Sequence, residues 1–359
     1  MEEKVIKIAA GIMGIMSMVI VCALFYFPTL HIWAEEKAQL HAQQKAEQQD
    51  KMNGLQMLQY NTANVEQETE IAFTQQLRIE VPQGSSVDKV KVTDDYLTQT
   101  ITIEIPDADE NYLYDYPMVG KSTNIDNLTY ESQEQDGIIE ITMDKVVEVE
   151  TTKDEQYVYL DFLTPHEVYD KVIVVDAGHG SKDPGASKQG ISEKDIDLAI
   201  LLELKKLFDA ESDGTIGVYY TRTEDANPSL SQRVELANKA EADLFVSIHN
   251  NSTKSGRMSS INGTAVMYDE AKATEEKGSM QFANICLEEL LASLGSNSKG
   301  LVAGNDIYII RSAEMPVALV EVGFMTNQDE LDSLKDAQYQ QKAAEGIYRA
   351  LHRALEEGY

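Results

Sequence analysis

Cysteine and basic residues are both scarce in this chain of 359 residues. Only Cys22 and Cys286 occur, and we expect them to lie too far apart to pair, which excludes a disulfide framework. Lys and Arg number 30 against 61 Asp and Glu, giving a formal net charge of −31. A nucleic-acid partner is therefore excluded, because binding a phosphate backbone needs clustered Lys and Arg. The simplest interpretation of the acidity is solubility.

One long apolar run stands at the N-terminus. Residues 8–27 contain no charged side chain and are long enough to cross a bilayer as a helix. Lys4 and Lys7 precede the run, whereas Glu35 and Glu36 follow it. The positive-inside bias then places the N-terminus in the cytoplasm and the remaining chain outside it.

Two other interpretations of this run are weaker. A cleaved signal peptide needs small residues at its cleavage site, and only Ala34 is available there. A lipoprotein signal needs a small residue before its cysteine, but Val21 precedes Cys22. We predict that residues 1–34 form a cytoplasmic tip and an uncleaved transmembrane helix, so that the protein is a single-pass membrane protein whose remaining chain lies outside the cytoplasm.

Two regions of different texture follow the apolar run. Residues 35–70 are rich in Ala, Gln, Glu and Lys with little apolar periodicity, which predicts a solvated stalk or linker. Within 71–168, short alternating runs rich in Val, Ile, Thr and Tyr are separated by turn clusters. A period of two with regular spacing predicts a small antiparallel all-β domain. No catalytic cluster is found in it.

Residues 169–359 alternate between strand-like and helix-like segments. Continuous apolar runs at 172–176 and 244–248 are typical of strands that are buried on both faces. Further strands are expected at 217–221, 264–268, 306–310 and 317–322, with helices at 195–208, 229–240, 274–293 and 338–355. This alternation predicts an α/β domain with a mostly parallel or mixed sheet and helices on both faces. Such sheets place their sites at the carboxyl ends of strands.

Polar residues stand at or just past three of these strand ends. His179 lies in the DAGHG run after the first strand, His249 ends LFVSIH, and Glu321 lies in VALVEV. Glu193 begins a helix after Ser192, so interaction with the helix dipole is its simplest role. Two His and one carboxylate are nevertheless a catalytic zinc set, with a fourth position left for water. Asp183 is an alternative oxygen ligand, although SKDPG is first a turn composition.

Glu321 has a second possible role. A charge inside an apolar strand is costly unless it is paired or functional. A structural ion pair with Arg311 is one explanation, and a general base for amide hydrolysis is the one that we prefer. Arg311 is also a weak candidate for orienting substrate, as is Asn251 in the polar sequence that follows His249.

These motifs, in this order, resemble the amidase-3 family of N-acetylmuramoyl-L-alanine amidases. The matching segments are DAGHG, SEKD, TRTED, SLSQRVELAN, DLFVSIHNN and VALVEVGFMTN, and they cover essentially all of residues 172–355. The resemblance implies cleavage of the amide between N-acetylmuramic acid and L-alanine in peptidoglycan. It also implies one zinc ion per chain, with His179, Glu193 and His249 as ligands and Glu321 as the catalytic glutamate. Ser181 stands where many members have a third glycine.

The β region resembles, in pattern alone, the AMIN-type domains that precede many cell-wall amidases. We expect it to position the enzyme through a wall polymer or a protein partner. Two alternatives to the amidase remain open: a zinc exopeptidase or deacylase that acts on another amide, and a non-catalytic wall-binding protein. The presence of all four polar residues argues against the last.

Overall fold

The computed structural model describes residues 54–59, 61–62, 74–121, 123–211, 214–273 and 275–359. The predicted transmembrane segment at 8–27 and most of the predicted stalk lie outside these residues. Among the helices that are described, none is both long and apolar enough to cross a membrane.

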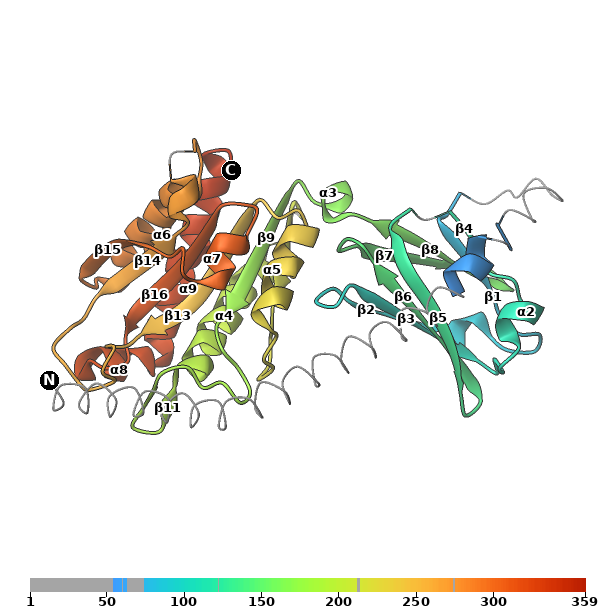
Figure 1. Ribbon diagram of the computed structural model, residues 1–359, viewed down its shortest axis with the longest axis horizontal. Helices are drawn as coiled ribbons and strands as arrows, with labels where there is room; N and C mark the ends of the chain where they lie inside the picture. The colour runs from blue at the N-terminus through green and yellow to red at the C-terminus, as the bar shows by residue number, and fades with distance from the viewer. Residues whose placement is uncertain (1–53, 60, 63–73, 122, 212–213, 274) are drawn as a thin grey trace, which may run out of the picture.

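A six-stranded mixed sheet forms the centre of the C-terminal half (Figure 1). In spatial order its strands are β12 (Ile216–Tyr220), β9 (Lys171–Ala177), β13 (Leu244–Asn251), β16 (Val317–Phe324), β14 (Thr264–Tyr268) and β15 (Ser298–Ala303). Neighbouring strands are parallel except for β14 and β16, which are antiparallel. The prediction of a mixed sheet is confirmed.

Helices cover both faces of this sheet, and the alternation of side chains along β9 shows why. Ile173 and Val175 point into one core, which contains α4 (Glu193–Asp209), α6 (Ser279–Leu294) and α9 (Ala337–Glu356). Val172 and Val174 point into the other. That second core contains α5 (Leu230–Lys239) and α7 (Tyr308–Ser312). A strand that is apolar on both sides therefore needs two layers of helices, as its continuous apolar run predicts.

The N-terminal half contains two antiparallel four-stranded sheets. One has the order β4 (Val119–Gly120), β1 (Leu77–Glu80), β8 (Tyr157–Leu163), β7 (Glu148–Lys153). The other has the order β2 (Lys91–Asp95), β3 (Thr100–Pro106), β6 (Asp136–Met143), β5 (Ile125–Gln133). Along β3 every second residue is buried, so the isoleucines of TITIEI enter one core that both sheets share.

Two sequence predictions differ from the structure. The apolar run at 306–310 is not a strand: α7 begins at Tyr308, because a short apolar run carries no period that separates strand from helix. Part of the predicted stalk is also packed against the β region. Leu58 is buried in its core, and the Thr62 hydroxyl accepts a hydrogen bond of 3.0 Å from the Gly120 amide.

Contacts join the β region to the α/β region. Val146, in the turn between β6 and β7, is fully buried in the core that contains α5. The Tyr219 hydroxyl on β12 donates a hydrogen bond to Glu148, and its ring meets that of Tyr96 edge-on at 5.4 Å. The β region thus covers part of the α/β region beside the outermost strand β12.

Candidate metal centre

Three neighbouring parallel strands bring the predicted site residues to one edge of the sheet. In the register of β13 and β9, Ile248 pairs with Ala177, the last residue of β9, so His249 lies beside the loop that carries His179. In the register of β13 and β16, His249 pairs with Glu321. The strand-end argument from the sequence therefore predicts the correct edge.

The two histidines converge on one carboxylate oxygen. Glu193 Oε1 lies 3.2 Å from His179 Nε2 and 3.1 Å from His249 Nδ1. The imidazole rings are 4.9 Å apart and nearly perpendicular, at 81°. This close approach depends on Gly178, because a Cβ there would lie 2.3 Å from the His249 ring.

Local backbone geometry aims His179 at this point. His179 has a left-handed φ of 58°, which is uncommon for a residue other than glycine, and Ser181 has a φ of 46°. Asp183 Oδ2 lies 2.9 Å from His179 Nδ1, on the side of the ring opposite Glu193. Asp183 therefore orients the imidazole from behind, as carboxylates commonly do for metal-binding histidines. This placement makes Asp183 a poor alternative ligand.

Glu193 is held in place by backbone amides. It begins α4, directly after the N-cap Ser192. The Ala186 amide donates to Oε2 at 2.7 Å and the Asn250 amide donates to Oε1 at 3.1 Å. Burial alone would raise the pKa of Glu193, but its bonds to His179 and His249 outweigh burial and lower the pKa below its usual range.

Asp197 is a fourth member of the cluster that sequence reasoning missed. His179, Glu193, Asp197 and His249 each place one ligand atom so that all four atoms lie within 4.8 Å of one another. Asp197 is fully buried, and its Oδ1 accepts a hydrogen bond of 2.7 Å from the Asn250 side chain. The available signal is its spacing of four from Glu193, which places both carboxylates on one face of α4.

This donor set fits a zinc ion. Imidazole nitrogen and carboxylate oxygen are common zinc donors, and two His with one Glu are a known catalytic set. The separations of about 3 Å between ring nitrogens and Glu193 are those of donors that face one point. The orienting contact from Asp183 is the second feature that such sites share.

Glu321 lies next to these residues and is not paired with Arg311. Its Oε2 is shielded from solvent and has no hydrogen-bond partner among the described residues. Burial raises the pKa of Glu321 to about 7. The Arg311 guanidinium instead donates a hydrogen bond of 2.8 Å to the Asp306 carbonyl and lies over the Tyr308 ring. The ion-pair explanation of Glu321 is therefore wrong.

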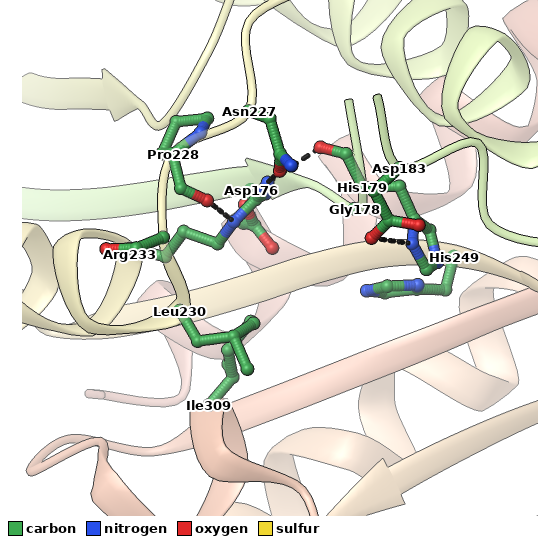
Figure 2. A pocket seen from close by; sticks show the side chains of 11 residues that line it. Asp176, Gly178, His179, Asp183, Asn227, Pro228, Leu230, Arg233, His249 and Ile309 are labelled. Carbon is green, nitrogen blue, oxygen red and sulfur yellow. Dashed lines mark hydrogen bonds and ion pairs between the residues drawn. The ribbon is translucent and has the colours of Figure 1, made fainter. Parts of the chain in front are cut away.

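A cavity of about 380 Å³ opens beside the histidines. Figure 2 shows Leu230 and Ile309 at one end, with His179, Asp183 and His249 at the other. Its lining is completed by Asp176, Gly178, Asn227, Pro228, Ser229 and Arg233. Arg311 and Asn251 do not line it, and their contact with substrate stays a prediction.

A mixed α/β sheet with a His–His–carboxylate cluster at its strand ends is an arrangement that suits a metal-dependent hydrolase. Comparison with known proteins makes the class specific. Residues 173–353 match the profile of the N-acetylmuramoyl-L-alanine amidase family, Amidase_3. The chain belongs to this family.

Individual proteins are similar to this chain over about half of its length. The amidase LytC of Bacillus subtilis is 36% identical over 181 residues, which are 50% of this chain and 35% of LytC. The germination-specific amidase of the same organism is 32% identical over 202 residues, covering 52% of this chain and 81% of the relative. The solved catalytic domain of CwlV from Paenibacillus polymyxa is 34% identical, with a TM-score of 0.47, and covers 52% of this chain and 98% of that domain.

Proposed function

We propose that this protein is a zinc-dependent hydrolase that cleaves the amide between N-acetylmuramic acid and L-alanine in peptidoglycan. The observation that carries the proposal is the convergence of His179 and His249 on Glu193, with the shielded Glu321 on the adjacent strand. The family membership supplies the bond that is cut.

His179, Glu193 and His249 would hold the metal. A zinc ion in this position would polarise the amide carbonyl and lower the pKa of a water molecule. Asp183 contacts Nδ1 of His179 and so keeps Nε2 of the same ring facing Glu193. The two backbone amides that bind Glu193 keep its carboxylate fixed in the charged form that metal binding requires.

Glu321 would move the proton. An unpartnered, shielded carboxylate oxygen is able to accept a proton from the attacking water and then to donate it to the departing alanine nitrogen. A carboxylate is suited to both steps when its pKa lies near the working pH, and burial shifts the pKa of Glu321 in that direction.

The other regions of the chain concern where the protein is located and what it binds. We propose that residues 1–34 anchor the protein in the membrane, that 35–70 link the anchor to the rest, and that the catalytic unit at 169–359 faces the wall outside the cytoplasm. The β region at 71–168 would position the enzyme on a wall polymer or a protein partner. Full-length protein that washes off membranes with salt alone would contradict the anchor.

Analysis of the products by mass spectrometry tests the reaction. Peptidoglycan digested with the purified protein should release peptides with a free N-terminal alanine and leave the glycan strands intact. A His179→Ala variant serves as the control and should release no such peptides. Shortening of the peptide stems from their ends, or loss of acetate from the sugars, would instead identify an exopeptidase or a deacylase.

A further inference from the structure

Arg222 belongs to the motif TRTED, to which the proposed mechanism assigns no role. It lies two residues past the end of β12, and only 4% of its surface is exposed. In the described part of the chain it forms no ion pair with a carboxylate, and all of its hydrogen bonds go to backbone carbonyl oxygens. A buried charge without an ion pair is costly, so its retention needs an explanation.

The partners of Arg222 are the chain neighbours of two proposed metal ligands. Its Nη2 donates to the Gly178 carbonyl at 2.7 Å and to the Lys194 carbonyl at 2.9 Å. Gly178 precedes His179, and Lys194 follows Glu193. One guanidinium nitrogen therefore donates hydrogen bonds to a carbonyl next to His179 and to a carbonyl next to Glu193.

Further hydrogen bonds fix the loop that carries His179. The Nε of Arg222 donates to the Ala177 carbonyl at 2.9 Å. Arg233 donates to the same carbonyl at 2.6 Å and to the His179 carbonyl at 2.7 Å. Three successive carbonyls are thus bound by two buried arginines. Such fixing is needed because His179 adopts a left-handed backbone conformation that is unfavourable for a residue with a side chain.

We propose that Arg222 is a positioning residue of the metal centre, which sets the spacing between His179 and Glu193 by binding the loop of one and the helix of the other. Lysine cannot replace it, because one ammonium group lacks the planar, forked set of donors that reaches Ala177, Gly178 and Lys194 together. Arg233 is the less useful residue to test, since its removal would leave the buried Asp176 without its ion-pair partner.

The inference rests on the proposed metal centre, and zinc affinity measured by competition with a chelating dye tests it in the full-length protein. Arg222→Gln should bind zinc about 10- to 100-fold more weakly than wild type, which is the range for residues that orient metal ligands. Arg222→Lys should also bind more weakly, although it keeps the charge. The Arg349→Gln control removes an exposed arginine of α9 that pairs with Glu289, and should not change the affinity.

A second readout separates positioning from folding. In the cobalt-substituted protein, the visible absorption of Co²⁺ reports ligand geometry and should change in Arg222→Gln while the far-ultraviolet circular dichroism does not. Folded variants with wild-type zinc affinity and an unchanged cobalt spectrum would overturn the proposal, as would loss of the fold in both Arg222 variants. Wild-type protein that binds no zinc would instead reject the proposed function.

Discussion

Glu321 is the residue on which the proposed chemistry depends most. Glu321→Gln keeps the shape of the side chain and removes the proton acceptor. General acid–base catalysis is worth about 10²- to 10⁴-fold, so we expect kcat to fall within that range. Zinc content should not change, since three other residues complete the protein side of a tetrahedral site.

Measuring zinc content, melting temperature and turnover on this variant distinguishes the possible roles. Near wild-type turnover would remove Glu321 from the mechanism. Loss of zinc would make Glu321 a ligand. A large drop in melting temperature with most of the rate kept would mean that the residue is structural.

Gly178 is the residue that lets the two histidines approach. A Cβ at this position would lie 2.3 Å from Cε1 of His249 and 2.6 Å from each of its ring nitrogens, so the whole ring would have to move. We expect Gly178→Ala to displace the His249 ring and to weaken zinc binding about tenfold or more. Gly190→Ala is a control for the loss of a glycine without crowding: no atom lies within 4 Å of its added Cβ, although its left-handed φ of 79° strains the substituted backbone. Equal zinc affinities in the two variants would show that the close approach is not needed.

We expect metal binding to depend on pH through His179, in the loop between β9 and α4. Burial would lower the pKa of His179, but Glu193 and Asp183 outweigh it and raise the pKa to about 9. Metal-free protein therefore carries a proton on His179 at neutral pH, and zinc must displace it. Below about pH 9, the zinc affinity should fall about tenfold for each unit of pH.

The same shift sets the sign of a stability change in metal-free protein. Charged His179 stabilises the fold fully below its unfolded-state pKa of about 6.5, and this contribution is lost as the pH rises through about 9. Chelator-treated protein should thus lose stability over that interval, and His179→Gln should flatten the curve. Zinc affinity that is constant between pH 6 and pH 8 would contradict the pKa shift.

The strands and helices that could be predicted from sequence are those with a clear period. β9 and β13 are long apolar runs, and α9 has the spacing of an amphipathic helix, so their type follows directly. The strand β15 was missed because SKGLVA is mostly exposed and has little apolar pattern.

The candidate metal cluster was predictable in part. His179 and His249 stand at strand ends, where the topology of a parallel sheet brings residues together from distant segments. Asp197 was not predicted, because a single carboxylate in a helix is usually a solvated residue and only the packing of α4 against β13 shows that this one is buried. The proposed role of Arg222 depends on hydrogen bonds to three backbone carbonyl groups. Every residue has a carbonyl group, so the sequence does not show which of them a distant arginine contacts.

The molecule as a whole joins a β region without a predicted catalytic set to the α/β region that carries the site. The contact is built from Val146, Tyr96 and Glu148 on one side and from β12 and α5 on the other. The Lys239 ammonium also donates to Gln99 Oε1 at 2.9 Å. None of these residues lines the cavity beside the histidines.

A fragment of residues 171–359 should therefore stay active but become less stable. Full burial of a single valine contributes about 1.5–3 kcal/mol, so loss of the contact should lower the melting temperature by about 5 °C or more. Its rate on soluble muropeptides should be comparable to that of the whole protein. A fragment that folds and binds zinc yet is inert would mean that the two regions share the active site.

The central claim is that one zinc ion, held by His179, Glu193 and His249, is needed to cut the amide between N-acetylmuramic acid and L-alanine. It is tested most directly by titrating chelator-treated, full-length protein with zinc while release of N-terminal alanine from peptidoglycan is measured. The account predicts no release without metal and a linear rise that ends at one equivalent of zinc per chain. Full activity in the metal-free protein, or no activity after one bound equivalent, would contradict it.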